Sequence, residues 1–194
     1  MKKSFTINVD LDELMGDFIP KIVNEFIRIA GPVEEFKGTE FTLTADISDV
    51  VYSYIAKDGG SEFTVKKGKI ESPMIYFSMS VEDVERIIQL RNIDLLLGIR
   101  TDQAGPFLSM EKYKAASSLK GSFRSEIDLP DGNVIAIETV LNGAAEPKSV
   151  FKISMENVVA LMKKETNPVN LFMSGAMKIE GDIAFAMSTQ PLFS

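Results

Sequence analysis

The spacing of apolar positions predicts a long helix near the start of the chain. Between residues 10 and 30, apolar side chains recur every three or four positions, which places them along one side of a helix. Asp10 precedes this stretch and is expected to cap its N-terminus. Pro20 lacks a backbone N–H, so it is expected to kink or split the helix, with Asp17 capping the second part. Gly31 is expected to end it.

The pattern then changes to alternation of apolar and polar residues, which predicts β-strands with one dry face and one wet face. Glycine-containing turn signals separate the alternating stretches, as between antiparallel neighbours. Ser80 follows the last stretch and is expected to cap a second helix. The predicted strands comprise residues 41–47, 50–56, 63–65 and 74–79.

After a helical stretch at residues 110–116, the same order of patterns begins again. Residues 123–129 and 134–141 alternate as the earlier strands do. The run Phe151–Val158 then lies over Phe77–Val84 with similar residue types at each position. Similarity between two parts of one chain is the mark of an internal repeat.

Two interpretations of this repetition are open. The first is a duplication, with residues 1–103 as a lobe that carries the N-terminal helix and residues 104–194 as a lobe that carries a closing strand and a C-terminal helix. The echo of Lys37-Gly38 in Lys120-Gly121 favours it. The second is one enlarged domain whose short strands resemble each other by chance. Whether two lobes would share one sheet is left open by the sequence.

The end of the chain, residues 167–193, predicts three short elements in succession. Asn167 is expected to cap a helix, and alternation around Met177 predicts a strand. Asp182 is expected to cap a last helix, Ile183–Met187, which is apolar on nearly every side. A helix without a polar face is expected to be buried, here against a partner that binds and dissociates.

The run from Leu171 to Asp182 resembles the closing signature of the sterol carrier protein type 2 family, a family of lipid carriers. Its Met-Ser-Gly and Gly-Asp pairs have that family's spacing around an alternating strand. Ala176 and Ser188 depart from Lys residues that are usual or frequent in the family, and both changes are expected at the surface. Residues 54–83 are also similar to the family, in which an Asp-Gly hairpin leads to a strand and a Ser-capped helix.

The resemblance implies an α+β fold of sterol-carrier type. We expect a predominantly antiparallel sheet, or two sheets, of about five strands per copy. Helices are expected to pack on one face and enclose an apolar tunnel. The implied function is non-enzymatic binding and transfer of a lipid or another apolar small molecule. A fatty acid, an acyl-CoA or a sterol-like molecule is the expected partner, with transient membrane contact and no cofactor.

Composition narrows the remaining function classes. A net charge of −7 argues against nucleic-acid binding, because that affinity comes largely from Lys and Arg on phosphates. The absence of Cys and His removes thiol nucleophiles, imidazole bases and the usual zinc ligands. Apolar runs stay short of the ~18 residues that a bilayer requires, and a cytoplasmic protein is predicted. The oligomeric state stays open.

Apolar side chains of the second half are the expected ligand contacts. Methionine is frequent among them, and it adapts to irregular apolar ligands better than branched residues do, although it also fills ordinary cores. No catalytic or metal-binding residue is expected. The expected ligand-binding residues are Ile153, Met155, Val158, Met162, Leu171, Phe172, Met173, Met177, Ile179, Phe185, Met187, Leu192 and Phe193.

Two other functions are weighed against the carrier. The apolar C-terminal surface is also consistent with a protein-interaction or accessory domain. An enzyme that uses carboxylates for acid–base chemistry on a lipid would need a buried carboxylate beside the ligand, for which Glu180 and Asp182 are the nearby candidates.

Overall fold

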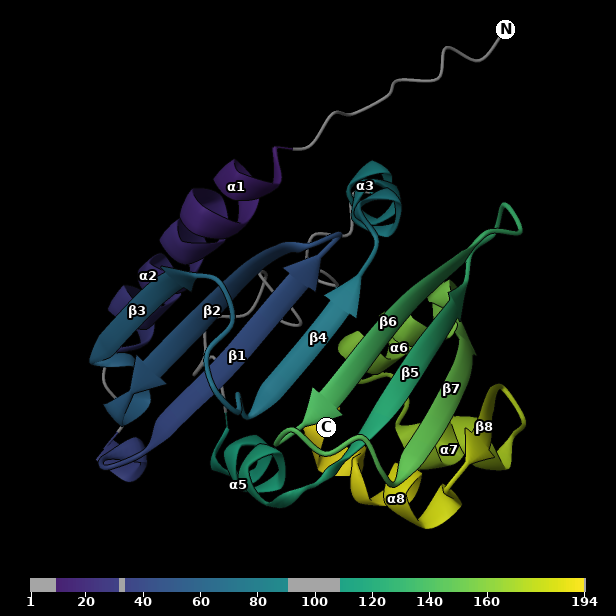
Figure 1. Cartoon of the computed structure of the whole chain (residues 1–194). Coiled ribbons are helices and arrows are strands. Elements are labelled where there is room, and N and C mark those ends of the chain that lie inside the picture. The colour runs from purple at the N-terminus through teal and green to yellow at the C-terminus, as the bar shows by residue number, and fades with distance from the viewer. Residues whose placement is uncertain (1–9, 32–33, 91–108, 194) are drawn as a thin grey trace, which may run out of the picture.

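A single mixed sheet of eight strands organises the molecule (Figure 1). The computed structural model describes residues 10–31, 34–90 and 109–193. The strand order is β3-β2-β1-β4-β6-β5-β7-β8. β1 pairs with β4 and β5 with β7 in parallel, and all other neighbours are antiparallel. The strands are β1 (Glu40–Ile47), β2 (Val50–Lys57), β3 (Glu62–Lys67), β4 (Ile75–Met79), β5 (Gly121–Asp128), β6 (Val134–Leu141), β7 (Lys148–Ser154) and β8 (Met177–Gly181).

The helices gather behind the sheet and at its ends, so that the face turned to the viewer in Figure 1 carries no helix. This arrangement confirms the predicted α+β class with an antiparallel-dominated sheet. The α-helices described are α1 (Leu11–Glu13), α2 (Ile19–Ala30), α3 (Val81–Gln89), α5 (Met110–Ser118), α6 (Met155–Met162), α7 (Pro168–Met173) and α8 (Ile183–Ser188). A π-helical segment, η1 (Leu14–Phe18), joins α1 to α2, and short 3-10 turns are η2 (Glu34–Phe36), η3 (Asp58–Gly60) and η4 (Gln190–Leu192).

The first helix corrects one prediction. Pro20 neither splits the helix nor gives Asp17 a capping role, because the chain passes through η1 into α2 without a break. In a π-helical turn each backbone hydrogen bond spans five residues instead of four. This turn lies directly before Pro20, which has no backbone N–H to donate. Asp17 instead forms an exposed ion pair with Lys21 at 2.6 Å. The N-cap at Asp10 is confirmed, since its Oδ1 accepts the backbone N–H of Glu13 at 3.0 Å.

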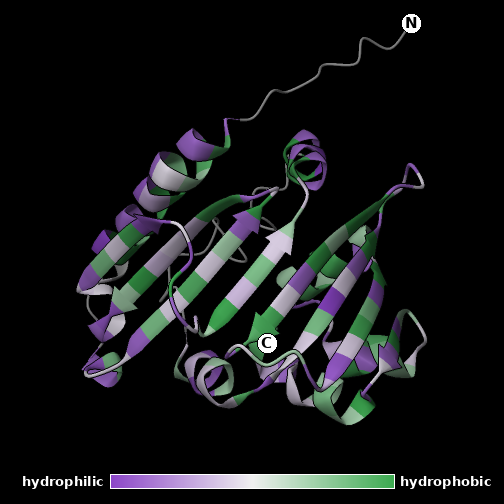
Figure 2. Cartoon of the chain, viewed as in Figure 1, coloured by the Kyte–Doolittle hydropathy of each residue, from purple (hydrophilic) through white to green (hydrophobic). Residues whose placement is uncertain are grey.

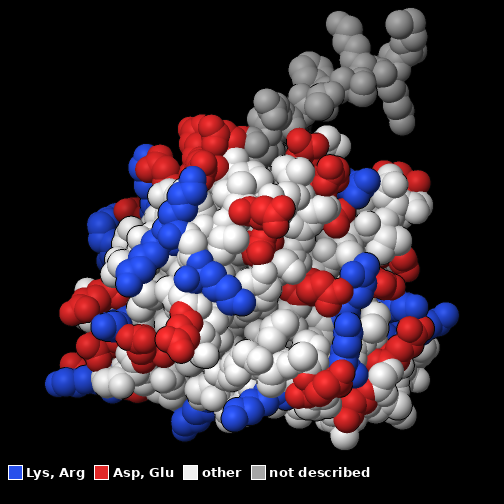
Figure 3. Space-filling model, viewed as in Figure 1, with Lys and Arg blue, Asp and Glu red and all other residues white. Residues whose placement is uncertain are grey.

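Alternation along the strands divides the sheet into a core face and an open face (Figure 2). Core-face side chains such as Ile47, Ile135 and Leu141 are fully buried against the helices. They belong to one hydrophobic cluster that extends through both halves of the sheet. Lys, Arg, Asp and Glu side chains are interleaved over the open face (Figure 3).

The connection from β3 to β4 covers part of the open face. The Ser53 hydroxyl donates to the carbonyl of Gly68 at 2.8 Å and accepts the backbone N–H of Ile70 at 3.2 Å. The same hydroxyl lies 2.9 Å from that of Thr44 on the neighbouring strand. Both side chains are therefore fully buried although they stand on the open face.

The two halves of the chain share this sheet through the antiparallel pair β4–β6. Each half contributes four strands. In the first half β3 adds to the outer edge of β2, and in the second half β8 adds to the outer edge of β7. At the joint, the free edge of β4 pairs with the free edge of β6. Neither strand is therefore left with unpaired backbone groups on that side. The predicted lobe boundary, between residues 103 and 104, lies outside the described residues, and the duplication stays a prediction.

Strand register shows which positions of the halves correspond. Phe77 and Phe151 each lie three residues before the serine that caps the next helix. Ala45 stands beside Phe77 in β1–β4, and Ser125 stands beside Phe151 in β5–β7. In this register Gly121 takes the place of Phe41 rather than that of a glycine before β1. The sequence pairing of Lys37-Gly38 with Lys120-Gly121 is therefore three residues out of register.

Candidate functional site

The C-terminal segment, defined here as residues 182–193, lies across the core-face ends of β5 and β7. Hydrogen bonds fix where it starts. Asp182 donates its backbone N–H to the carbonyl of Lys148 at 2.9 Å, and Ser149 donates its hydroxyl to the carbonyl of Asp182 at 2.6 Å. The Asp182 carboxylate accepts the N–H of Phe185 at 2.8 Å, which confirms the predicted N-cap of α8.

The ring of Phe185 occupies space that the sheet leaves open at Gly121. A Cβ added at Gly121 would lie 2.6 Å from the Phe185 ring and 2.6 Å from the carbonyl oxygen of Pro147. Only glycine therefore allows α8 to approach β5 this closely. Phe185 is 6% exposed as a result, although it sits on a short helix at the molecular edge.

Phe193 ends the described part of the segment on two buried rings of the core face. Its ring centroid lies 5.8 Å from that of Phe123 and 6.2 Å from that of Phe151. The two sheet rings are themselves 5.6 Å apart, and all three contacts are edge-to-face. Phe193 is 41% exposed, so it closes this aromatic group on its outer side.

The structure brings most of the expected ligand-binding residues into or against the hydrophobic cluster. Those buried within it are Ile153, Met155, Leu171, Met177 and Phe185. Those that pack against it partly buried are Val158, Phe172, Ile179 and Leu192. Met162 and Met187 are half-buried, and Phe193 contacts the cluster through its ring.

Met173 and α8 depart from the predicted burial. Met173 is 78% exposed at the end of α7 and points away from the cluster. On α8 the burial is one-sided: Phe185 and Ala186 are buried, while Ile183 is 50% exposed. A two-turn helix at the edge of a sheet has only one face toward the core, so apolar composition alone does not bury its other face.

Register reveals a further feature that the sequence pattern does not. The core-face tyrosines of β2, Tyr52 and Tyr54, correspond to Ile137 and Thr139 of β6. The second half therefore carries smaller side chains at two central positions of the same sheet face. Gly121 in the place of Phe41 adds a third reduction, which the Phe185 ring fills. Strand pairing is needed to find these correspondences, because the residues themselves share no motif.

Charged groups near the segment lie on the outside. Glu180 is on the open face of β8, is 58% exposed, and pairs with Lys152 at 2.8 Å, which raises the pKa of that lysine. The Asp182 carboxylate is committed to its helix cap. Neither is the buried carboxylate that an acid–base enzyme would need. Nowhere in the described ranges do three or more metal-ligating side chains come together as a metal site.

Within residues 10–31, 34–90 and 109–193, no helix combines the length and apolarity needed to cross a membrane.

No curated protein sequence matches the chain. Solved structures with a detectable likeness include sterol carrier protein 2 like 2 from Aedes aegypti, at 18% identity over 57% of this chain and 95% of that one, with a TM-score of 0.33. Another is the sterol carrier protein domain 2 of Helicoverpa armigera, at 22% identity over 56% and 85%, with a TM-score of 0.34.

One likeness extends over nearly the whole chain. Sterol carrier protein-2 like-3 from Aedes aegypti is 10% identical over 92% of this chain and 95% of that one, with a TM-score of 0.24. The family model of the SCP-2 sterol transfer family matches residues 109–194, which contain the complete second half of the sheet and the C-terminal segment. Residues 109–194 therefore form a domain of the SCP-2 sterol transfer family.

Proposed function

We propose that the protein is a non-enzymatic carrier that binds a lipid or another apolar small molecule between the sheet and helices of its second half. The family to which residues 109–194 belong is generally one of lipid carriers rather than enzymes. The single observation that carries the proposal is the C-terminal segment, whose apolar side chains lie on the core face of the half in which Ile137 and Thr139 stand in the places of Tyr52 and Tyr54. The expected contacts are the apolar residues that pack there, with Met155 and Met177 among them.

The energetics are adequate for such a ligand. Burial of a sixteen-carbon chain at about 0.8 kcal/mol per methylene gives roughly 12 kcal/mol of gross stabilisation. Association and ordering cost several kcal/mol, which leaves about −8 kcal/mol, or micromolar affinity. A long-chain fatty acid and an acyl-CoA both meet this requirement. The carrier is proposed to act in the cytoplasm.

The segment is proposed to serve as the gate. An apolar ligand can leave only if the side chains that cover it move aside. The segment can do so because the chain holds it at one end only. A protein truncated after Gly181 is expected to fold and to lose lipid uptake. Truncated protein that still folds and takes up lipid as before would refute the gate.

The direct test of the carrier is lipid extraction. Protein purified under native conditions is extracted with organic solvent, and the extract is analysed by mass spectrometry. A lipid present in stoichiometric amount supports the carrier. Absence of any lipid, together with no binding of added palmitate, hexadecanol or cholesterol, refutes it.

Exposed apolar side chains favour an interaction domain as the second candidate. Met173, Ile183 and Phe193 are 78%, 50% and 41% exposed, and all belong to the last part of the chain. Exposed apolar side chains that form a patch are typical of a protein interface. A stable oligomer without bound lipid would favour this function, and mutation of Met173 and Ile183 to Ser would then dissociate it.

A further inference from the structure

Thr139 carries a buried hydroxyl that has no hydrogen-bond partner among the described residues. The residue is 7% exposed and stands on the core face of β6, opposite Phe77 of β4 and Phe123 of β5. Every fully enclosed side-chain oxygen or nitrogen of the described residues does have a partner. The Thr139 hydroxyl therefore borders space that a small molecule can enter.

The corresponding hydroxyl of the first half is bound by its own cover. Tyr54 stands in the place of Thr139 there, and its hydroxyl donates to the carbonyl of Met15 at 2.8 Å. A threonine hydroxyl is attached to Cβ and stays close to the sheet, so it cannot reach a covering helix as the phenol does. An acceptor for Thr139 must come from a molecule that lies between the sheet and its cover.

Ser125 places a second hydroxyl diagonally across from that of Thr139. Ser125 is opposite Ile137 and Thr139 is opposite Phe123, which puts the two side chains about 7 Å apart on the core face. The Ser125 hydroxyl also has no partner in the described ranges. Ser125 is half-buried although β5 is a central strand, whereas Ala45, which takes its place in the first half, is 3% exposed. The core face is therefore covered less completely at the two hydroxyls.

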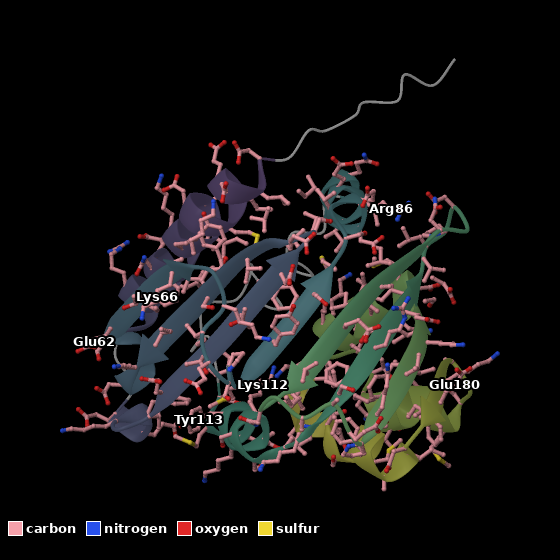
Figure 4. The ribbon with its side chains drawn as sticks, in the orientation of Figure 1. Glu62, Lys66, Arg86, Lys112, Tyr113 and Glu180 are labelled. Atoms are coloured by element: carbon pink, nitrogen blue, oxygen red, sulfur yellow. The ribbon has the colours of Figure 1, made fainter. Side chains whose placement is uncertain are left out.

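The sheet offers no counter-ion at this place. The three strands β4, β5 and β6 lie wholly within the described residues, and none of their core-face positions carries a charged side chain. The labelled charged residues of the sheet in Figure 4, Glu62, Lys66 and Glu180, belong to its edge strands β3 and β8. An ionised group beside the hydroxyls would lose its hydration without gaining a charged partner, whereas an uncharged oxygen needs only a hydrogen bond.

Apolar side chains lie beyond the hydroxyls in both directions along the strands. Ile127 and Ile135 form the next pair beyond Ser125, and Leu141 lies beyond Thr139 on β6. All three are buried on the core face. A ligand that places an oxygen at the hydroxyls therefore meets apolar surface on either side of that oxygen.

We propose that Thr139, together with Ser125, forms the hydrogen-bonding point of the carrier site. The pair selects an apolar molecule whose chain carries an uncharged oxygen, a hydroxyl or a ketone, with hydrocarbon on both sides of it. This inference rests on the proposed carrier function and names its ligand class. A plain hydrocarbon chain gains the apolar contacts but leaves both protein hydroxyls without a partner.

The test measures binding of stearate, 10-hydroxystearate and 2-hydroxystearate, which share one chain length. The unmodified protein is expected to bind the 10-hydroxy isomer more tightly than the 2-hydroxy isomer, because only the former has its hydroxyl in the middle of the chain. Thr139→Val is expected to weaken 10-hydroxystearate about tenfold, the effect of one lost buried hydrogen bond, and to leave the other two unchanged. Ser125→Ala is expected to have the same selectivity with a smaller effect. Thr139→Ser keeps a hydroxyl and is expected to retain the preference.

The matched control is Thr64→Val, which removes an exposed threonine hydroxyl from β3 and is expected to leave all three affinities unchanged. Equal affinity of the unmodified protein for the two isomers, or an equal effect of Thr139→Val on all three ligands, would overturn the hydrogen-bonding point while the carrier function stood. Failure of all three to bind the unmodified protein would instead overturn the carrier function itself. Thermal unfolding shows which variants are folded, and if Thr139→Val is not, Ser125→Ala and the comparison of the isomers decide.

Discussion

The two halves of the sheet are covered in different ways, although three strands of each half, β2-β1-β4 and β6-β5-β7, follow the same order. In the first half, the long N-terminal helix is tied to β2 by two phenol hydroxyls: Tyr52 donates to the carboxylate of Asp12 at 2.8 Å and Tyr54 donates to the carbonyl of Met15 at 2.8 Å. In the second half, the C-terminal segment is hydrogen-bonded at its start and continues through ring contacts of Phe185 and Phe193.

This difference has a physical consequence for where a ligand fits. A hydrogen bond requires a defined position of both partners, whereas apolar contacts keep much of their free energy when the surfaces slide. Ile137 and Thr139 stand in the places of the two tyrosines in the second half, so the cover there has no phenol hydroxyl of β6 to bind it. The first half is built as a fixed support, and the second half is the better place for a cover that opens.

The largest expected effect comes from making the first half resemble the second. Tyr54→Thr removes a buried ring and the hydrogen bond to Met15, and it is expected to lower the free energy of unfolding by about 4 kcal/mol. Tyr54→Phe keeps the ring and is expected to cost about 1 kcal/mol. Urea denaturation measures both. A change of less than 1 kcal/mol for Tyr54→Thr would show that the tyrosine is not a support of the helix.

A substitution beneath the C-terminal segment is expected to rank second. In Gly121→Ala the new Cβ meets the Phe185 ring and the Pro147 carbonyl, and the backbone φ of 141° disfavours a side chain. The expected loss is about 3 kcal/mol in the same measurement. Gly38→Ala is the control, because its φ of 77° is also unfavourable but no atom lies within 4 Å of its Cβ. Equal losses for the two variants would mean that backbone strain, not contact with α8, decides the effect.

Much of the local structure was predictable from the sequence because it depends on neighbouring residues. The N-caps at Ser80, Asn167 and Asp182 all accept the expected backbone N–H, and the strands begin and end within two residues of most predicted positions. Such features follow from side-chain chemistry and from periods of two and 3.6 residues. The closing signature of the family was identified differently, by the resemblance of the run from Leu171 to Asp182.

Features that depend on pairing between distant strands were not predictable. The pairing of β4 with β6 puts both halves in one sheet, and the sequence of neither strand indicates which strand it pairs with. The replacement of Tyr54 by Thr139 becomes visible only once register is known. Met173 belongs to the predicted apolar set, yet it faces outward because α7 turns only Leu171 and Phe172 toward the core. A lone pattern of apolar residues does not fix which side of a short helix is buried.

A smaller effect is expected at the outer ring of the aromatic group. Phe193→Ala loses two edge-to-face contacts, but the ring is already 41% exposed, so the free energy of unfolding should fall by only about 1 kcal/mol. If the segment is a gate, release of a bound fluorescent fatty acid should become several-fold faster in stopped-flow measurements. Met173→Ala is the control at an exposed position and should alter neither quantity. Unchanged release in Phe193→Ala would place the gate elsewhere.

The smallest effect concerns the charge that ties the N-terminal helix to the sheet. Hydrogen bonds from Lys67, at 2.7 Å, and from Tyr52 lower the pKa of the Asp12 carboxyl below its ordinary value of 3.8. Because the folded-state pKa is depressed, this stabilisation is fully present above about pH 4 and is lost as the pH falls through the folded-state value. Asp12→Asn should therefore lower the melting temperature slightly at pH 7 and make no difference near pH 2. Since the C-terminal segment does not depend on Asp12, lipid binding at pH 7 should be the same in both proteins. A melting-temperature difference that persisted undiminished at pH 2 would show that Asp12 acts through its shape rather than through its charge.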